Sequence, residues 1–173
     1  MRLFIAINFN DETRSSLLAL RDELSGKSVS GRFSAPENLH LTLVFLGECD
    51  DRQTATVKSV LGAVDFEPLE ILVDRIGRFK RSGGEIWWAG LRASERLSAL
   101  QAELTEKLIA AGFAPDRREY NPHITLGREV VTRERPWTIK PFGETACAID
   151  LMKSERIGGK LTYTSIYRRK AVF

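Results

Sequence analysis

An α+β fold with mostly antiparallel sheet is the fold class that the sequence predicts. Strand-like segments outnumber helical ones along the chain. Several neighbouring strands are joined by turns too short for the crossover connections of a parallel sheet. One short phrase also occurs twice, at residues 38–43 (NLHLTL) and 121–126 (NPHITL). This repetition suggests a chain built from two related halves.

Length, charge and cysteine usage set outer limits on the protein. The 173 residues fit one domain, or two small lobes that share a core. The formal net charge of +3 suits an anionic ligand without demanding one. No stretch approaches the ~18 apolar residues of a membrane span, and the first apolar run is too short for a signal peptide. Cys49 and Cys147 lie far apart, outside any CxxC pair, which is typical of a reducing compartment, so we expect a cytoplasmic protein.

The chain opens with a strand and a helix. Residues 2–9 are rich enough in β-branched and aromatic side chains for a strand. A leucine-striped helix should follow, capped by the side chain of Asn10 or Asp11 and ended by Gly26. Residues 28–36 are polar, contain glycine and proline, and are expected to form a loop.

The middle of the chain predicts a strand, a helix and a hairpin. Residues 39–47 (LHLTLVFLG) alternate at their start and indicate a buried strand. A second helix is expected over residues 51–64, capped by one of the aspartates at its beginning. Residues 69–79 and 85–91 form a predicted antiparallel pair, because the KRSGG segment between them suits a hairpin turn.

The last part of the chain predicts one helix and three strands. Ser94 caps the clearest helix of the chain, which has leucines at helical spacing and stops at Gly112. Residues 123–131, 142–153 and 161–172 are strand-like, and a Gly-Gly pair lies in the turn between the last two.

The doubled phrase puts a histidine and a threonine on one face of each of two predicted strands. Side chains two residues apart in a strand project from the same face, so His40 lies beside Thr42 and His123 beside Thr125. The apolar residues between and after them should face a core. Two such strands related by a pseudo-twofold axis would place all four polar side chains around one cleft.

Two histidines and two threonines around one cleft fit phosphoryl transfer. Opening a phosphodiester ring needs a base for water and an acid for the departing oxygen, and histidine, with an unperturbed pKa of ~6.5, serves as either. In-line attack needs these groups on opposite sides of phosphorus. Threonine hydroxyls can donate to the non-bridging oxygens. The scheme requires no metal and no cofactor.

Two other interpretations of the histidines carry less weight. A single histidine in a strand is usually structural, but both histidines of this chain occupy the same tetrapeptide context. A zinc site needs at least three protein ligands, and the chain has no HExxH spacing and no cysteine pair.

These residues resemble the two-histidine phosphoesterase superfamily, which is defined by paired His-x-Thr/Ser-x motifs, here residues 40–43 and 123–126. Within it the chain is most similar to the bacterial and archaeal RNA 2′,3′-cyclic phosphodiesterases, historically called 2′-5′ RNA ligases. The similarity runs essentially end to end. It is carried by RLFIAI near the start, NLHLTLVFLGE at 38–48, NPHITLGR at 121–128, and LMKS at 151–154 followed by a Gly-Gly pair and Tyr163.

The resemblance implies a single bilobed domain over the whole chain, each lobe an antiparallel sheet with outer helices, and a cleft between the lobes. It implies hydrolysis of a 2′,3′-cyclic phosphate to a 2′-phosphate. By this correspondence His40 would be the acid and His123 the base that activates water. Thr42 and Thr125 would hold the phosphate oxygens, and Arg128 would contact phosphate or stack on a base.

Binding of RNA, rather than of a small nucleotide, should require basic and aromatic surface around the cleft. The candidates in loops are Lys80, Arg81, Arg117, Arg118, Tyr120 and residues 133–135. Such clusters are more often solvated faces. Trp87 and Trp88 are adjacent in a predicted strand, so at most one would line a cleft, and we expect both to pack.

The expected activity is metal-independent hydrolysis of RNA 2′,3′-cyclic phosphate ends by a monomer, with reversible 2′-5′ ligation as a side activity. Two alternatives stay open. One is the same chemistry on a small cyclic nucleotide or ADP-ribose cyclic phosphate. The other is a non-catalytic RNA- or nucleotide-binding module, against which the intact histidines and threonines of both motifs argue.

Overall fold

Nine strands and three α-helices make up the computed structural model, which describes all 173 residues. The strands are β1 (Arg2–Ile7), β2 (Ser28–Phe33), β3 (Leu41–Glu48), β4 (Leu69–Phe79), β5 (Glu85–Leu91), β6 (His123–Thr132), β7 (Trp137–Ala146), β8 (Ala148–Ile157) and β9 (Lys160–Lys170). The helices are α1 (Asp11–Gly26), α2 (Asp51–Gly62) and α3 (Glu95–Ala110), with a short 3₁₀ turn, η1 (Pro36–Asn38). No helix has the length and apolarity needed to cross a membrane.

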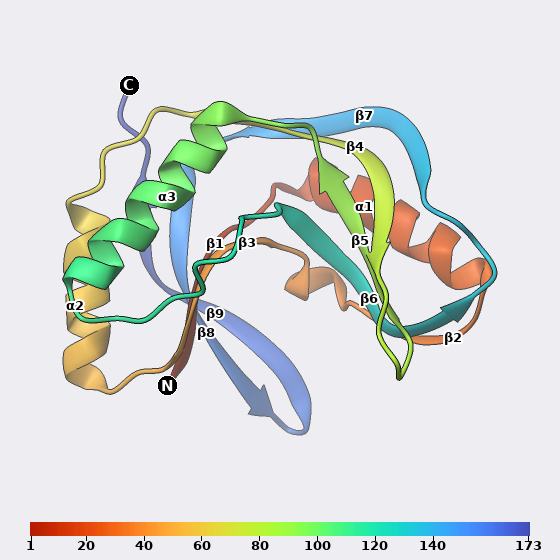
Figure 1. Cartoon of the computed structure of the whole chain (residues 1–173), viewed down its shortest axis with the longest axis horizontal. Coiled ribbons are helices and arrows are strands. Elements are labelled where there is room, and N and C mark those ends of the chain that lie inside the picture. The colour runs from red at the N-terminus through yellow and green to blue at the C-terminus, as the bar shows by residue number, and fades with distance from the viewer.

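The strands form two antiparallel sheets, which confirms the predicted fold class. The first sheet has the order β3-β1-β8-β9, and the second has the order β2-β6-β5-β4-β7. The first sheet therefore joins the start of the chain to its end, as the red and blue strands of Figure 1 show. Each sheet forms one lobe, and its strands come from separate parts of the chain. The two lobes are therefore interleaved along the sequence and are not its successive halves.

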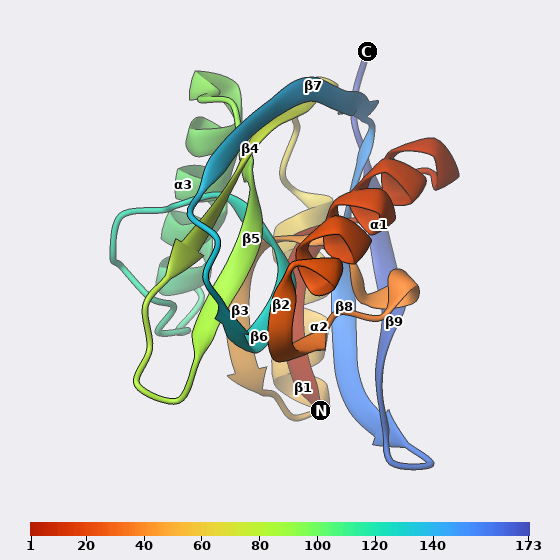
Figure 2. The same cartoon turned by 90° about the vertical axis from the view of Figure 1, so that its right-hand side faces the viewer.

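The helices cover the outside of the two sheets. Helix α1 packs on β2, β6 and β7 of the second sheet, while α2 and α3 pack against each other and against the first sheet. Figures 1 and 2 show α1 on one side of the molecule and the α2–α3 pair on the other. One continuous hydrophobic core runs through both sheets and all three helices, with Ile5, Leu24, Trp87 and Leu104 among its fully buried members.

Capping fixes where each helix begins. The side chain of Asn10 accepts a hydrogen bond from the backbone of Thr13, and Ser94 caps α3 in the same way. Asp50 forms a full capping box with Gln53 at the start of α2. These contacts satisfy N–H groups that have no partner inside the helix. The predicted starts of the helices are therefore confirmed, as are the bounds of β4 and β5.

Two sequence-based expectations are wrong. The segment predicted as a loop over 28–36 contains β2, an edge strand that pairs with β6. Most of its side chains are exposed, so it has no apolar alternation to reveal it. The single strand predicted over 142–153 is two strands in different sheets, with the break at Cys147. Cys147 is followed by more apolar residues, so nothing in the local pattern marks the change of sheet.

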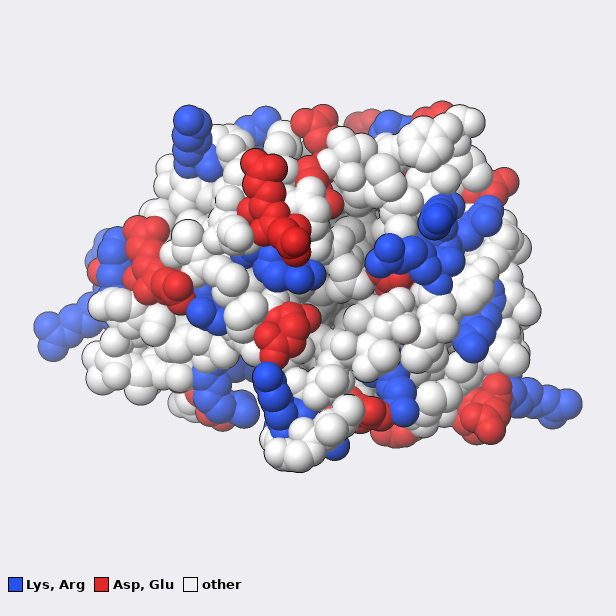
Figure 3. All heavy atoms as spheres, turned by 180° about the vertical axis from the view of Figure 1, so that it is seen from behind, with Lys and Arg blue, Asp and Glu red and all other residues white.

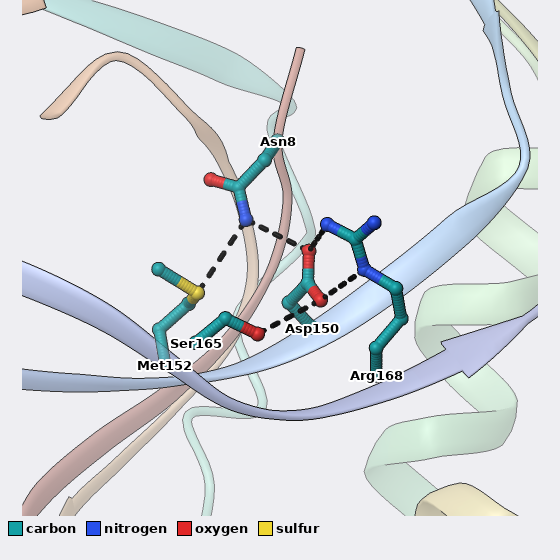
Figure 4. Close-up of polar contacts among 5 residues, drawn as sticks. All are labelled: Asn8, Asp150, Met152, Ser165 and Arg168. Carbon is teal, nitrogen blue, oxygen red and sulfur yellow. Dashed lines mark hydrogen bonds and ion pairs between the residues drawn. The ribbon is translucent and has the colours of Figure 1, made fainter. Parts of the chain in front are cut away.

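A buried carboxylate ties together three strands of the first sheet (Figure 4). Asp150 on β8 is 1% exposed and accepts two hydrogen bonds from Arg168 on β9, at 2.9 and 3.2 Å. Ser165 donates to it at 3.0 Å and Asn8, just after β1, at 2.8 Å. A buried charge is tolerated only when it is paired and hydrogen-bonded in this way.

We expect Arg168→Gln to destabilise the fold, because the buried Asp150 carboxylate would lose its counter-charge. The donors Asn8 and Ser165 remain, so the loss in free energy of unfolding should be about 2–3 kcal/mol, somewhat below the cost of fully orphaning a buried charge. Urea unfolding followed by circular dichroism measures it. Arg118→Gln is the matched control, because its ion pair with Asp116 lies at the surface, and it should unfold like the wild type. Equal midpoints for both variants would contradict this role of Arg168.

Candidate active site

His40 lies immediately before β3, two residues after the end of η1, and both of its ring nitrogens are hydrogen-bonded. Its Nδ1 lies 2.7 Å from the backbone oxygen of Asn38. A carbonyl oxygen only accepts, so Nδ1 donates and carries the proton of the neutral ring. The Thr42 hydroxyl then donates to the free Nε2 at 2.8 Å. Phe4 and Tyr163 pack against the ring at 4.9 and 5.1 Å between centroids.

His123, the first residue of β6, repeats this arrangement on the other sheet. Its Nδ1 lies 2.7 Å from the backbone oxygen of Asn121, two residues earlier, as in the first motif. Phe79 packs edge-on against the ring at 5.1 Å, and Trp88 lies at 6.1 Å. The Nε2 atom makes no hydrogen bond within the chain, so it is free to meet a ligand.

Both histidines, both threonines and Arg128 line one cleft of about 910 Å³. The strand alternation expected for the two motifs is confirmed. Leu41, Leu43, Ile124 and Leu126 are buried in the core on the opposite face. The structure therefore brings together all five residues that the sequence singled out.

The electrostatics of the cleft favour neutral histidines while it holds no anion. Burial lowers the pKa of His40, and the positive charges of Arg128 and His123 lower it further. Burial, followed by the charge of Arg128, also lowers the pKa of His123. Arg128 is exposed and forms no ion pair, so its charge is not neutralised within the chain. An anion beside Arg128 would offset the positive charge of Arg128 and so favour a protonated histidine.

Tyr120 links the loop before the second motif to the strand of the first. Its hydroxyl donates to the backbone oxygen of Thr42 at 2.8 Å. Burial raises the pKa of this phenol, so the hydroxyl stays protonated and remains a donor. The contact fixes the separation of the two motifs across the sheets.

The predicted basic loops do not line the cleft. Lys80, Arg81, Arg117 and residues 133–135 all lie outside it, and Arg118 is engaged with Asp116. Trp87 and Trp88 are both buried, which confirms that they pack. Seen from behind, basic and acidic side chains are interspersed over the surface (Figure 3), so charge alone marks no binding face there.

Other residues that the sequence did not assign to the site do line the cleft. The basic and aromatic ones come from both sheets: Arg2, Phe4, Arg32, Phe33, Phe45, Arg156, Lys160 and Tyr163. The alternation of β1 could have indicated Arg2 and Phe4 as a pair on one face, but not which face meets the cleft. No group of three or more His, Cys, Asp or Glu side chains is placed to hold a metal ion.

Comparison with known proteins places this chain in a family. The chain matches the model of the 2′-5′ RNA ligase superfamily over residues 10–148. A relative from Archaeoglobus fulgidus, named RNA 2′,3′-cyclic phosphodiesterase, is 36% identical over 152 residues, 83% of this chain and 85% of the relative. One of the same name from Escherichia coli is 30% identical over 171 residues, 96% of this chain and 94% of the relative.

Solved structures agree with the sequence matches. The crystal structure of Escherichia coli LigT complexed with 3′-AMP is 27% identical to this chain and has a TM-score of 0.85. The likeness covers 99% of this chain and 98% of that one. A crystal structure described as a phosphoesterase gives a TM-score of 0.84 at 28% identity over the same shares of the two chains. The resemblance inferred from the two motifs is thus confirmed, and the chain belongs to the 2′-5′ RNA ligase superfamily.

Proposed function

We propose that this chain is an RNA 2′,3′-cyclic phosphodiesterase that uses His40 and His123 as its acid/base pair. The observation that carries the proposal is the matched fixing of both imidazoles, each with Nδ1 bound to a backbone oxygen and Nε2 directed to one cleft. The names of the relatives from Archaeoglobus fulgidus and Escherichia coli support this substrate class.

The proposed reaction divides the two protons between the histidines. His123 Nε2 is unoccupied and takes a proton from water as the water oxygen bonds to phosphorus. The bond from phosphorus to O3′ breaks, and protonated His40 gives its Nε2 proton to O3′. The product is a 2′-phosphate with a free 3′-hydroxyl, and the histidines exchange protonation states. Solvent returns them to the starting state.

Thr42, Thr125 and Arg128 are proposed to bind the phosphate. Arg128 neutralises charge on the non-bridging oxygens, where charge must be stabilised through the transition state. The Thr42 hydroxyl donates to His40 Nε2 only while that atom is unprotonated. Once His40 Nε2 is protonated it can no longer accept a hydrogen bond. The Thr42 hydroxyl is then free to donate to a phosphate oxygen instead. Protonation of His40 thus makes the Thr42 hydroxyl available to bind the phosphate.

We further propose that the enzyme acts as a monomer in the cytoplasm and needs no metal. One chain supplies both histidines and both threonines, and both cysteines are free. The same step with the 5′-hydroxyl of a second RNA in place of water would form a 2′-5′ linkage, as the oxygen of that hydroxyl bonds to phosphorus and the bond to O3′ breaks. Ligation therefore requires no additional groups.

We expect hydrolysis of a cyclic-ended oligonucleotide to persist in excess chelator, and His40→Ala or His123→Ala to lower kcat/KM about 100-fold or more, the usual contribution of a positioned acid or base. Rates are measured by separating the 2′,3′-cyclic substrate from the 2′-phosphate product. Unfolding midpoints near the wild-type value show that the variants are folded. Undiminished activity in either variant would refute the acid/base pair, and loss of wild-type activity in chelator would refute the metal-free mechanism.

The pH profile tests the electrostatic role of Arg128. Its charge lowers the pKa of both histidines, so Arg128→Gln should raise both values and move the bell-shaped profile of kcat/KM to higher pH. The maximum should also fall, because a phosphate contact is lost. Arg118→Gln, whose charge is engaged with Asp116 outside the cleft, should leave the profile in place. A shift of the Arg128→Gln profile toward lower pH would contradict the assignment.

A further inference from the structure

Arg128 faces the cleft against the alternation of its own strand. Successive side chains of a strand point to opposite faces of the sheet. Ile124 and Leu126 are fully buried in the core, so an unbroken β6 would turn Arg128, two residues further on, into the core as well. Arg128 is instead exposed and lines the cleft together with Thr125. An irregularity of β6 is therefore needed to turn this side chain.

Two β-bulges in β6 supply the turn. The step from Thr125 to Gly127 is paired with a single-residue step of β5, and the step from Gly127 to Val130 is paired with a two-residue step. Each extra residue reverses which face the following side chain meets. After the first bulge Gly127 faces the core, where a Cβ atom would lie 3.0 Å from the side chain of Val130, and Arg128 faces the cleft. After the second bulge Val130 returns to the core.

The second bulge is centred on Glu129. The neighbouring strand β2 shows the same extra residue, between Arg128 and Val131. Glu129 has a φ of 52° and is the only residue other than glycine with a positive φ in the chain. Side chains disfavour this left-handed backbone, so it persists only where the surrounding structure enforces it.

Gly84 enforces the backbone conformation of Glu129. It lies in the turn that joins β4 and β5 (Figure 1). A Cβ atom at this position would lie 2.7 Å from both Cα and the carbonyl carbon of Glu129, closer than real Cβ atoms approach. The φ of Gly84 is 116°, which glycine adopts without steric cost. On the other side, the Glu129 carboxylate pairs with Arg32 of β2 at 2.8 Å.

We propose that Gly84 and Glu129 are positioning residues for the reaction, because the bulge that they maintain sets where the Arg128 guanidinium meets the substrate phosphate. The inference rests on the proposed function and deepens it. Neither Gly84 nor Glu129 lines the cleft, so each acts through Arg128. His123 and Thr125 come before both bulges, so a change at Glu129 should leave them in place.

Two replacements of Glu129 separate its backbone from its side chain. Glu129→Gly and Glu129→Val both remove the carboxylate and its ion pair with Arg32. Glycine adopts a positive φ freely, whereas β-branched valine resists it. Glu129→Val should therefore lower kcat/KM on a cyclic-ended oligonucleotide about 10-fold, as expected when a charge-assisted hydrogen bond is lost, and Glu129→Gly should stay near the wild-type value. Glu70→Val, at an exposed position of β4 outside the cleft, is the matched control.

Two alanine variants of the β4–β5 turn test the same bulge from its other side, and they keep the test decisive if Glu129→Val does not fold. Gly84→Ala presses a Cβ atom on the Glu129 backbone and should reproduce the loss in kcat/KM. Gly83→Ala is its control, because a Cβ atom there has no neighbour within 4 Å. Combining Gly84→Ala with Arg128→Gln should give an enzyme no slower than Arg128→Gln alone, since residues that act through one group are not additive.

An NMR titration of the imidazole protons reports the position of Arg128 without turnover. The chain has only two histidines, so two titration curves are expected. Because the charge of Arg128 lowers the pKa of both histidines, moving the guanidinium away should raise both pKa values in Glu129→Val and in Gly84→Ala. The pKa values should not change in Gly83→Ala.

The outcomes separate the inference from the proposed function. Equal histidine pKa values and equal kcat/KM in Glu129→Val and Glu129→Gly, or in Gly84→Ala and Gly83→Ala, would overturn the positioning role. So would a further loss of activity when Gly84→Ala is added to Arg128→Gln. Raised histidine pKa values in a protein whose wild type hydrolyses no cyclic-ended RNA would refute the proposed function alone.

Discussion

The hydrogen bond from each histidine Nδ1 to the backbone oxygen two residues earlier fixes the tautomer and the orientation of the imidazole, and the use of the cleft depends on both. It selects one tautomer, because the carbonyl oxygen only accepts. It also turns each ring so that Nε2 meets the cleft. The bond is local, so each motif needs only its own short segment to form it. The fold as a whole then has to bring the two motifs, each with its imidazole already oriented, to opposite sides of one cleft.

The interleaved topology accomplishes this at the level of the sheets. His40 precedes an edge strand of the first sheet, while His123 begins an inner strand of the second. The continuous core and the bond from Tyr120 to the Thr42 backbone hold these strands at a fixed separation. Since β8 and β9 return to the first sheet, the end of the chain also contributes Tyr163 beside His40. A domain of two sequential halves would lack that contact.

These relations explain which features the sequence predicts. The sequence predicts elements with one buried face, such as α1, α3, β4 and β5, from their periodicity and capping residues. It predicts the four motif residues from strand alternation. The exposed edge strand β2 and the change of sheet at Cys147 leave no local pattern. The pairing of Arg2 with the region of Arg156 depends on the β1–β8 register. Such long-range contacts are set by packing of the whole chain, which no local spacing encodes.

The two histidines differ in one respect that bears on their roles. His40 is enclosed by Phe4, Tyr163 and the Thr42 hydroxyl, whereas His123 Nε2 is unoccupied. Burial that lowers the pKa of His40 makes its protonated form a stronger acid and thus a better donor to a departing oxygen. The same burial makes that form costly in an empty cleft, so the proton should be taken up together with the anionic substrate. His40 is then protonated, and able to act as the acid, only when a phosphate is present. The Nε2 of His123, which has no partner in the chain, accepts the proton of the attacking water.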